Sequence, residues 1–489
     1  MQSSPSRRHL RVPLLLAASV LLGLLLRLIV GLSPVGWLAW LAPAPLLALA
    51  FRLPGREAWG TVLLAALIGV SANFHYRLLI FGPLAASAAT ASQAIVFSLV
   101  VMQARRLVIR YQAAWTVLAY PVLWVAVDTL GSVLKNSGNE GSLAYSQVEC
   151  LPILQVVSLF GIVGLLFLVT LVPSTLAMAG AFGRVVPRAW LAYAGTLLLL
   201  AASIVFGLAR LHHPVSGRKT TLGLVAIDDA IGLKASPSYI KSIWDEYDRH
   251  VSSLSAQGAE IIVLPEKTGL LAPATASQWQ RHLGELAARH HVWLEAGVGI
   301  DDGEGRVNRA WLFTPAGTLT ASYDKQHLAP GEHGYLAGAA DVVQQMQSHR
   351  YGLAICKDMF FAALGRAYGD RDAAVMLVPS WNPTFEDARA EGLNTLTRGV
   401  ESGYAVVRVA REGYLTVSDA YGRILAEKKS SPLPGTALLA TIRVADRMPT
   451  LYGRIGDLFG WVCVAASAVL LSIGRRWPRP FGTGPAISP

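Results

Sequence analysis

Charged residues are scarce in this chain of 489 residues. Asp, Glu, Lys and Arg make up only 15% of the sequence, against roughly 25% in an ordinary soluble protein. Hydrophobic residues reach 53%. This composition excludes a simple soluble enzyme, which needs a charged surface, and it excludes a disordered chain, which lacks hydrophobic residues.

Cysteine is also rare. The three cysteines, Cys150, Cys356 and Cys463, show none of the paired spacings typical of a metal site. The glycine-rich stretches lack the spacing of a phosphate-binding loop. We therefore expect neither a metal nor a cofactor.

The net charge of +11 is unevenly distributed. Residues 214–451 hold 26 acidic and 24 basic residues, a net charge of −2, whereas the two flanks together carry +13. Because the positive charge belongs to the hydrophobic flanks, it indicates membrane topology and argues against a nucleic-acid partner.

The flanks contain apolar stretches long enough for membrane-spanning helices, since about 20 helical residues cross a hydrocarbon core of about 30 Å. The predicted spans are residues 12–30, 37–51, 58–80, 84–104, 114–134, 153–182, 189–210 and 455–473. The sequence thus predicts a polytopic α-helical membrane bundle of about eight spans. Residues 1–213 hold seven of them, and residues 452–489 hold the last helix and a cytoplasmic tail.

The orientation follows from the short loops, because Lys and Arg are retained on the cytoplasmic side. With the N-terminus inside, the inner side carries Arg7, Arg8, Arg11, Arg52, Arg56, Arg105, Arg106, Arg110, Arg184, Arg188, Arg475, Arg476 and Arg479. The outer loops carry only Arg77 and Lys135. Residues 214–451 are then extracytoplasmic. A cleaved signal peptide is the alternative for the first span, although no small-residue cleavage site follows it.

Residues 214–451 have a different pattern. Short apolar runs flanked by turn residues predict strands at 221–227, 260–264, 292–298, 310–313, 352–355, 373–378, 404–409 and 437–442. Helical periodicity appears at 238–256, 277–290 and 386–402. Strands that alternate with helices and are then followed by close strands predict an inserted, layered α/β or α+β domain.

Three predicted strand ends carry reactive residue types. Glu266 ends the run 260–266, Lys325 follows a short strand, and Cys356 follows the run 351–355. An acyl-transferring thiol needs a base for its proton and a cation for the developing oxyanion. The residue types alone leave the alternative of a buried structural thiol and two solvated surface charges.

The order of these motifs resembles the nitrilase or carbon–nitrogen hydrolase superfamily: Pro-Glu at 265–266, Tyr-x-Lys-x-His-Leu at 323–328, and Ile-Cys at 355–356. With seven spans before the domain and one after it, the chain resembles the bacterial apolipoprotein N-acyltransferases. Supporting motifs are Ser142–Gln147, Arg398–Glu401 with Arg408, and Thr450–Asp457.

The resemblance implies a nitrilase-like αββα sandwich with a catalytic triad. Glu266 would be the general base, Cys356 the nucleophile, and Lys325 the cation that stabilises the tetrahedral intermediate. Glu332 would match an additional active-site carboxylate, and the backbone N–H of Lys357 would contribute to the oxyanion hole. Asp358 is expected as a further active-site residue.

The resemblance also implies the reaction and its location in the cell. The thiolate takes an acyl chain from a membrane phospholipid, and the α-amine of a diacylglyceryl-cysteine at a lipoprotein N-terminus accepts the chain from the thioester. The partners are these two lipids and the membrane, in the bacterial cytoplasmic (inner) membrane, with the catalytic domain on the periplasmic side. Activity is expected to fall in acid, because Cys356 and Glu266 must exchange a proton.

Several positions depart from the family pattern. Lys357 and Asp358 stand where an aromatic residue and Glu are usual, and the Lys357 ammonium could lower the pKa of the thiol or point into solvent. Residues 379–382 replace Ser-Asn-Asp-x-Trp, residues 226–229 replace Gln-x-Asn, and Glu332 comes one position early. Two alternatives therefore stay open. One is a paralogue with the same chemistry and another acceptor, an amine or water, and the other is a non-catalytic membrane binding protein.

Overall fold

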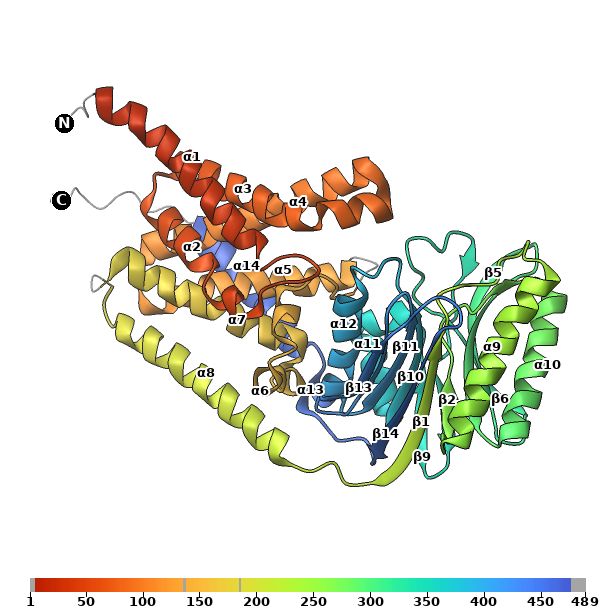
Figure 1. Ribbon diagram of the computed structural model, residues 1–489. Helices are drawn as coiled ribbons and strands as arrows, with labels where there is room; N and C mark the ends of the chain where they lie inside the picture. Colours follow the sequence, from red (N-terminus) through yellow and green to blue (C-terminus); the bar gives the residue numbers. More distant parts are fainter. Residues whose placement is uncertain (1–4, 135–137, 184–185, 476–489) are drawn as a thin grey trace.

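The computed structural model describes residues 5–134, 138–183 and 186–475. A helical part and a layered α/β part lie side by side, with α11 (Ala362–Asp370) and α12 (Ala388–Ser402) of the layered part nearest the helical part (Figure 1). Four positions used for the orientation prediction, Lys135, Arg184, Arg476 and Arg479, lie outside the described residues, as does the rest of the C-terminal tail.

The helical part is built from both flanks of the sequence. Its helices are α1 Pro5–Arg27, α2 Pro43–Arg52, α3 Gly55–Val70, α4 Phe74–Tyr111, α5 Ala119–Leu134, α6 Leu151–Leu154, α7 Val157–Phe182, α8 Ala189–His212, α13 Leu451–Ile455 and α14 Leu458–Arg475. In the described part of the chain, four helical stretches are long and apolar enough to cross a membrane: Gly55–Tyr111, Ala114–Leu134, Val157–Phe182 and Ala189–His212. Shorter apolar helices occupy Gly36–Arg52 and Leu458–Gly474. These helices fit a membrane part, and the total of eight spans stays a prediction.

The third predicted span is divided in the structure. Helix α3 ends at Val70, and a short turn, Ser71–Asn73, leads into α4. Helix α4 is itself interrupted at Gly82, whose φ of +78° lies in the left-handed region that glycine tolerates. Pro83, which lacks an N–H, follows the interruption. The segments on the two sides of this break pack against each other, since Arg77 Nη1 donates to Thr90 Oγ1 at 3.0 Å and Ala66 and Val70 pack with Ala94. The chain therefore reverses direction at Gly82, which is the boundary expected between 80 and 84.

Two β-sheets form the centre of the α/β part. The first has the order β14-β1-β2-β4-β5-β6, with β3 beside β4 and β7 beside β5. The second has the order β13-β12-β11-β10-β9-β8. The strands of the first sheet are β1 Arg218–Ala226, β2 Ile261–Val263, β3 Leu270–Leu271, β4 Trp293–Asp301, β5 Arg306–Phe313, β6 Leu319–Asp324, β7 Tyr335–Leu336 and β14 Thr436–Val444. Those of the second are β8 Val342–Met346, β9 His349–Leu353, β10 Val375–Trp381, β11 Ala405–Arg411, β12 Tyr414–Ser418 and β13 Ile424–Lys429. All eight predicted strands are confirmed.

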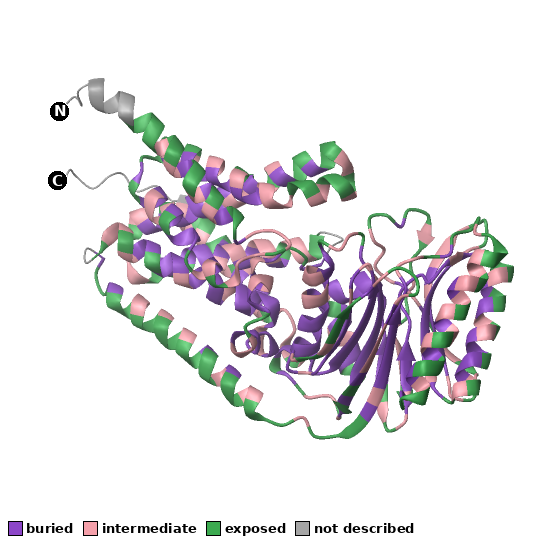
Figure 2. Ribbon diagram, viewed as in Figure 1, coloured by how far each residue is buried: buried purple, intermediate pink, exposed green. Residues whose placement is uncertain are grey.

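Helices cover the outer face of each sheet. Helices α9 (Pro237–Ala256) and α10 (Pro273–His290) pack on the first sheet, and α11 (Ala362–Asp370) and α12 (Ala388–Ser402) pack on the second (Figure 1). Side chains alternate along β1, so that Leu222 and Leu224 enter the core between the sheets while Val225 faces the helices. The central strands, such as β1, β10 and β11, are therefore buried on both faces along most of their length, as Figure 2 shows. The result is the expected four-layer αββα sandwich.

The two parts of the molecule are joined by buried polar contacts. Helix α7 is broken at Gly161, where φ is +68° and the ring of Tyr452 lies so close that a Cβ would meet it at 2.4 Å. Ile162 N–H, just beyond the break, donates to Glu401 Oε1 at 2.8 Å. Glu401 also pairs with Arg398 at 2.8 Å. The motifs Arg398–Glu401 and Thr450–Asp457 thus contribute to the junction between the sandwich and the helical part.

One core residue, Glu295, has a buried carboxyl group that forms no hydrogen bond with any described residue. Glu295 on β4 alternates with Leu294 and Ala296, which face the helices, so its side chain lies between the sheets. It is fully buried, and neither of its oxygens has a hydrogen-bond partner among the described residues. Burial raises the pKa of Glu295 well above its ordinary value. The proton therefore stays bound in the folded state at pH values where the unfolded chain releases it.

We expect Glu295→Met to stabilise the protein by about 1–3 kcal/mol near neutral pH, because it removes a buried polar group that has no partner. A raised pKa contributes stability that is complete below the ordinary carboxyl value and is lost as the pH rises toward the folded value. The advantage of the variant is therefore expected to grow from about pH 4 upward. Thermal unfolding of detergent-purified protein across pH measures it, and an advantage that shrinks with rising pH contradicts the argument.

Candidate active site

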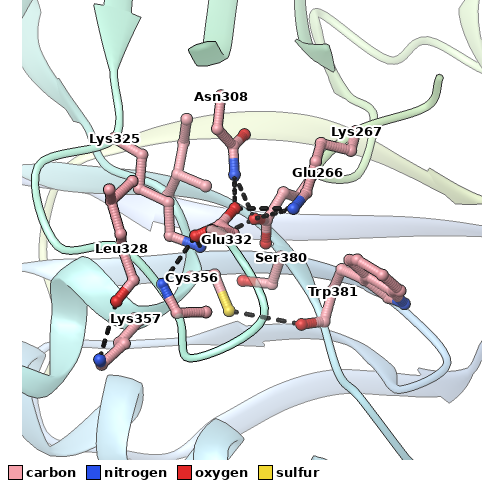
Figure 3. A network of polar contacts seen from close by, with 12 residues as sticks. Glu266, Lys267, Asn308, Lys325, Leu328, Glu332, Cys356, Lys357, Ser380 and Trp381 are labelled. Carbon is pink, nitrogen blue, oxygen red and sulfur yellow. Dashed lines mark hydrogen bonds and ion pairs between the residues drawn. The ribbon is translucent and has the colours of Figure 1, made fainter. Parts of the chain in front are cut away.

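Glu266 and Lys325 meet at the end of the first sheet. Glu266 comes three residues after β2, and Lys325 directly follows β6. Lys325 Nζ lies 2.9 Å from Glu266 Oε1, and both residues are about 1% exposed. Two predicted site residues that are 59 positions apart in sequence thus form a buried ion pair (Figure 3).

A second carboxylate and a second ammonium complete this network. Glu332 Oε2 lies 3.0 Å from Lys325 Nζ, and Glu332 Oε1 lies 2.7 Å from Lys267 Nζ. Asn308 Nδ2 donates to Glu266 Oε1 and to Glu332 Oε1, at 2.6 Å each. The early position of Glu332 in the sequence therefore does not keep it from the site. Lys267 and Asn308 were not anticipated from the sequence.

Lys325 and Glu332 both remain charged near neutral pH. Burial alone lowers the pKa of Lys325, but Glu266, Cys356 and Glu332 outweigh it and raise that pKa well above its ordinary value. Burial likewise opposes ionisation of Glu332, but Lys325 and Lys267 hold the pKa of Glu332 at about 2. The site thus keeps a fixed positive charge beside the reactive thiol.

Cys356 begins the short helical turn η5 (Cys356–Phe360), which follows β9. Its φ of +48° is in the left-handed region, which non-glycine residues rarely adopt and which is frequent at functional sites. The thiol Sγ lies 3.5 Å from the carbonyl oxygen of Trp381 and 3.9 Å from Glu391 Oε2. In Figure 3 the side chains of Glu266, Lys325 and Cys356 converge.

The resting thiol is protonated. Burial raises the pKa of Cys356 well above its ordinary value, and Glu266 and Glu391 raise it further, while Lys325 offsets part of this effect. A protonated thiol needs a base before it can attack a carbonyl carbon. Glu266 Oε2 is buried and accepts no hydrogen bond from any described residue, so this oxygen is free to take a proton.

The two residues after the nucleophile have distinct surroundings. Lys357 is buried, and its Nζ donates to the carbonyl oxygen of Leu328 at 2.9 Å, so it does not point into solvent. Asp358 is fully buried and accepts from Tyr323 Oη and from the backbone N–H of His327, both at 2.7 Å. Asp358 also accepts from Ile355 N–H at 3.1 Å. Asp358 thus holds the Lys325 loop against the Cys356 turn without contacting the sulfur.

Sequence reasoning missed Glu391, a further carboxylate at the sulfur. It lies in the first turn of α12, inside the stretch predicted as an amphipathic helix. A glutamate in such a helix is normally a solvated surface residue, and Glu391 is only 8% exposed. One feature of the sequence is related to this residue, the departure from the family pattern at 379–382. Asn382 lies in this stretch, and its Nδ2 donates to Glu391 Oε2 at 2.6 Å.

Comparison with known proteins accounts for both parts of the chain. Residues 22–175 match the apolipoprotein N-acyltransferase N-terminal domain, and residues 231–436 match the carbon–nitrogen hydrolase domain. An apolipoprotein N-acyltransferase of Geobacter metallireducens is 25% identical, with 94% of this chain and 95% of that protein covered. An apolipoprotein N-acyltransferase of Bradyrhizobium diazoefficiens is 27% identical, with 74% of this chain and 75% of that protein covered.

A third relative matches a smaller part of the chain. The omega-amidase NIT2 of Homo sapiens is 27% identical over 36% of this chain and 75% of its own length. The similarity to the two bacterial acyltransferases, by contrast, extends over the helical part and the sandwich together. The chain therefore belongs to the apolipoprotein N-acyltransferase family, whose domain outside the helices is of the nitrilase or carbon–nitrogen hydrolase type.

Proposed function

We propose that this protein transfers a fatty acyl chain from a membrane phospholipid, through a thioester on Cys356, to the N-terminal amine of a diacylglyceryl-cysteine lipoprotein. The observation that carries the proposal is the convergence of Glu266, Lys325 and Cys356 from three strand ends of a nitrilase-type sandwich. This sandwich is joined to a bundle of apolar helices.

The first half-reaction forms the thioester. Glu266 takes the proton of the Cys356 thiol, and the sulfur attacks the carbonyl carbon of a phospholipid ester. The Lys325 ammonium, with the backbone N–H of Lys357, stabilises the negative charge on the carbonyl oxygen. The ester C–O bond then breaks, the leaving oxygen takes the proton from Glu266, and a lysophospholipid departs.

The second half-reaction forms the amide. The uncharged acceptor amine attacks the thioester carbon, its N–H proton passes to Glu266, and the C–S bond breaks. The leaving sulfur then recovers the proton from Glu266, which restores both groups for the next cycle. Glu332 keeps Lys325 oriented throughout, because its Oε2 lies 3.0 Å from the Lys325 Nζ.

The membrane arrangement supports the choice of lipid substrates. In our proposal residues 1–213 and 452–489 are membrane regions, and residues 214–451 form a periplasmic catalytic domain of a bacterial inner-membrane protein. Asn139 N–H, five residues after α5, donates to the carbonyl oxygen of Phe360 at 3.4 Å. Phe360 ends the turn that Cys356 begins, so a lipid lying against the helices is close to the nucleophile.

A second candidate function is hydrolysis or aminolysis of another acyl compound by the same three residues. It is favoured by the similarity of part of the chain to the human omega-amidase and by the departures at Lys357 and Asp358. The third possibility, a non-catalytic binding protein, is disfavoured by the buried and fully formed ion pair beside Cys356.

Expression of this chain in bacterial cells depleted of their own N-acyltransferase tests the proposal. We expect mass spectrometry of a lipoprotein N-terminus to show one added acyl chain, which is absent from cells without this protein. A thioester on Cys356 with an unmodified lipoprotein N-terminus contradicts the proposed acceptor and favours the second candidate. If neither product forms while the protein is folded in the membrane, the acyl-transfer proposal fails.

A further inference from the structure

Glu391 is a buried carboxylate at the nucleophile that the two half-reactions above do not use. Its Oε2 lies 3.9 Å from Cys356 Sγ, and about 10% of its side chain remains exposed. It approaches the sulfur from α12 on the second sheet, whereas Glu266 approaches from the first sheet. The thiol therefore has a carboxylate on each of the two sheets that enclose it.

The position of Glu391 is fixed by two buried donors. Asn382 Nδ2 donates to Glu391 Oε2 at 2.6 Å, and Arg408 Nη2 donates to the same oxygen at 3.3 Å. Arg408 Nη2 also donates to Asn382 Oδ1 at 3.0 Å, so each of the three side chains is hydrogen-bonded to the other two. A buried carboxylate is costly unless such partners hold it. This support keeps one carboxylate oxygen directed at the sulfur.

The surroundings of Glu391 make it a stronger base than an exposed glutamate. Burial raises the pKa of Glu391 well above its ordinary value, Asp387 raises it further, and Arg408 lowers it. Asp387 is in turn hydrogen-bonded by Tyr76 of α4 at 2.7 Å. The ionisable groups around Glu391 are Cys356 on η5, Glu266 after β2, Arg408 on β11, Asp387 before α12, and Glu140 before α6.

The proposed acceptor creates a need for such a base. An α-amine has a pKa of about 7.7–8, so near neutral pH it is mostly an ammonium without a lone pair for attack. The other face of the site carries the ammonium groups of Lys267 and Lys325, which repel a cation. Glu391 is the carboxylate that reaches the sulfur from the side opposite to this pair of lysines.

We propose that Glu391 binds the primary ammonium of the acyl acceptor and takes its first proton, so that an uncharged amine attacks the acyl group on Cys356. This inference rests on the proposed function. The ammonium N–H bond breaks, the proton moves to Glu391 Oε2, and the nitrogen lone pair forms the new C–N bond as the C–S bond breaks. The second N–H proton passes to Glu266 and then to the sulfur, and Glu391 returns its proton to water.

The approaching ammonium also favours the charged form of Glu391. An opposite charge within a few ångströms lowers the pKa of a carboxyl group, which offsets the effect of burial. Glu391 thus binds the cation when the acceptor arrives and becomes neutral once the proton has moved. A neutral acceptor needs no such partner, and this difference separates the proposed role from a purely structural one.

Glu391→Gln tests the inference, because glutamine keeps the hydrogen bond from Asn382 and loses the charge. In single-turnover experiments with full-length protein in phospholipid vesicles, intact-protein mass spectrometry follows the thioester on Cys356. We expect the variant to form the thioester within about twofold of the wild-type rate and to transfer it to a diacylglyceryl-cysteine peptide about 100-fold more slowly near pH 7. Transfer to hydroxylamine, which is uncharged at this pH, is expected to be unchanged, and raising the pH toward 9 is expected to restore peptide acylation.

Glu386→Gln is the matched control, because Glu386 is an exposed glutamate just before the same helix. It is expected to behave like the wild type with both acceptors. Equal slowing of the peptide and hydroxylamine reactions by Glu391→Gln, or no recovery at high pH, overturns the role assigned to Glu391. Failure of the wild-type protein to form any thioester overturns the proposed function instead, so the two failures are distinguishable.

Discussion

Cys356→Ala is expected to abolish acyl transfer, with a loss of at least about 10⁴-fold, because the substitution removes the sulfur that carries the acyl chain in the proposed mechanism. The substitution removes one sulfur atom from a buried turn and leaves the ion pair between Glu266 and Lys325 intact. The fold is therefore expected to persist while the thioester disappears. Mass spectrometry of the intact protein after incubation with phospholipid vesicles measures the acyl adduct, and lipoprotein analysis measures the product.

Cys150→Ala is the control for this experiment. Cys150 is an exposed free thiol outside the sandwich, so its removal is expected to leave both the adduct and the product at wild-type levels. If Cys356→Ala retains lipoprotein acylation, the thioester mechanism is wrong. If a lipid-binding or partner-binding activity alone exists and survives the substitution, the non-catalytic alternative is correct.

Lys325→Met is expected to impair both activity and stability. The Lys325 ammonium lies 2.9 Å from Glu266 and 3.0 Å from Glu332, and all three side chains are at most 3% exposed. Breaking a buried pair by removing one partner typically costs about 3–5 kcal/mol, because the remaining charge has lost its compensation. Loss of a group that stabilises the oxyanion costs about 10²–10³-fold in rate. Thermal unfolding and the rate of thioester formation measure the two effects separately.

A double variant separates the structural role of Lys325 from its catalytic one. Lys325→Met combined with Glu266→Gln removes one carboxylate charge together with the ammonium, so stability is expected to recover in part while activity stays lost. Lys234→Met is the matched control, because Lys234 is exposed, and it is expected to change neither quantity. A stable and active Lys325→Met protein contradicts the role proposed for this lysine.

Much of the active site could be predicted because strand ends leave a periodic signal in the sequence. Glu266 and Cys356 follow buried apolar runs, and those runs form strands β2 and β9. Lys267 was adjacent to a predicted residue, yet only the structure shows that its Nζ reaches Glu332 at 2.7 Å. Asn308 lies within β5, and the sequence of this strand does not indicate which residues the asparagine side chain contacts. Such contacts depend on which strands are adjacent in the sheet, and the apolar pattern of a strand does not predict the order of the strands.

Patterns that are local in the chain can be read from the sequence, whereas contacts between distant segments are known only from the tertiary structure. Hydrophobic periodicity and charge asymmetry are properties of the sequence itself, so they predict the apolar helices and an inserted α/β or α+β domain. The resemblance carried by three short motifs implies the sandwich and the residues of the proposed triad. The junction through Glu401 and the second carboxylate at Cys356 arise from contacts between distant segments. Glu391 has the sequence pattern of a surface helix residue, and only the packing of α12 against the Cys356 turn buries its carboxylate beside the sulfur. Burial and neighbouring charges set the chemistry of a side chain, and both are properties of the folded chain.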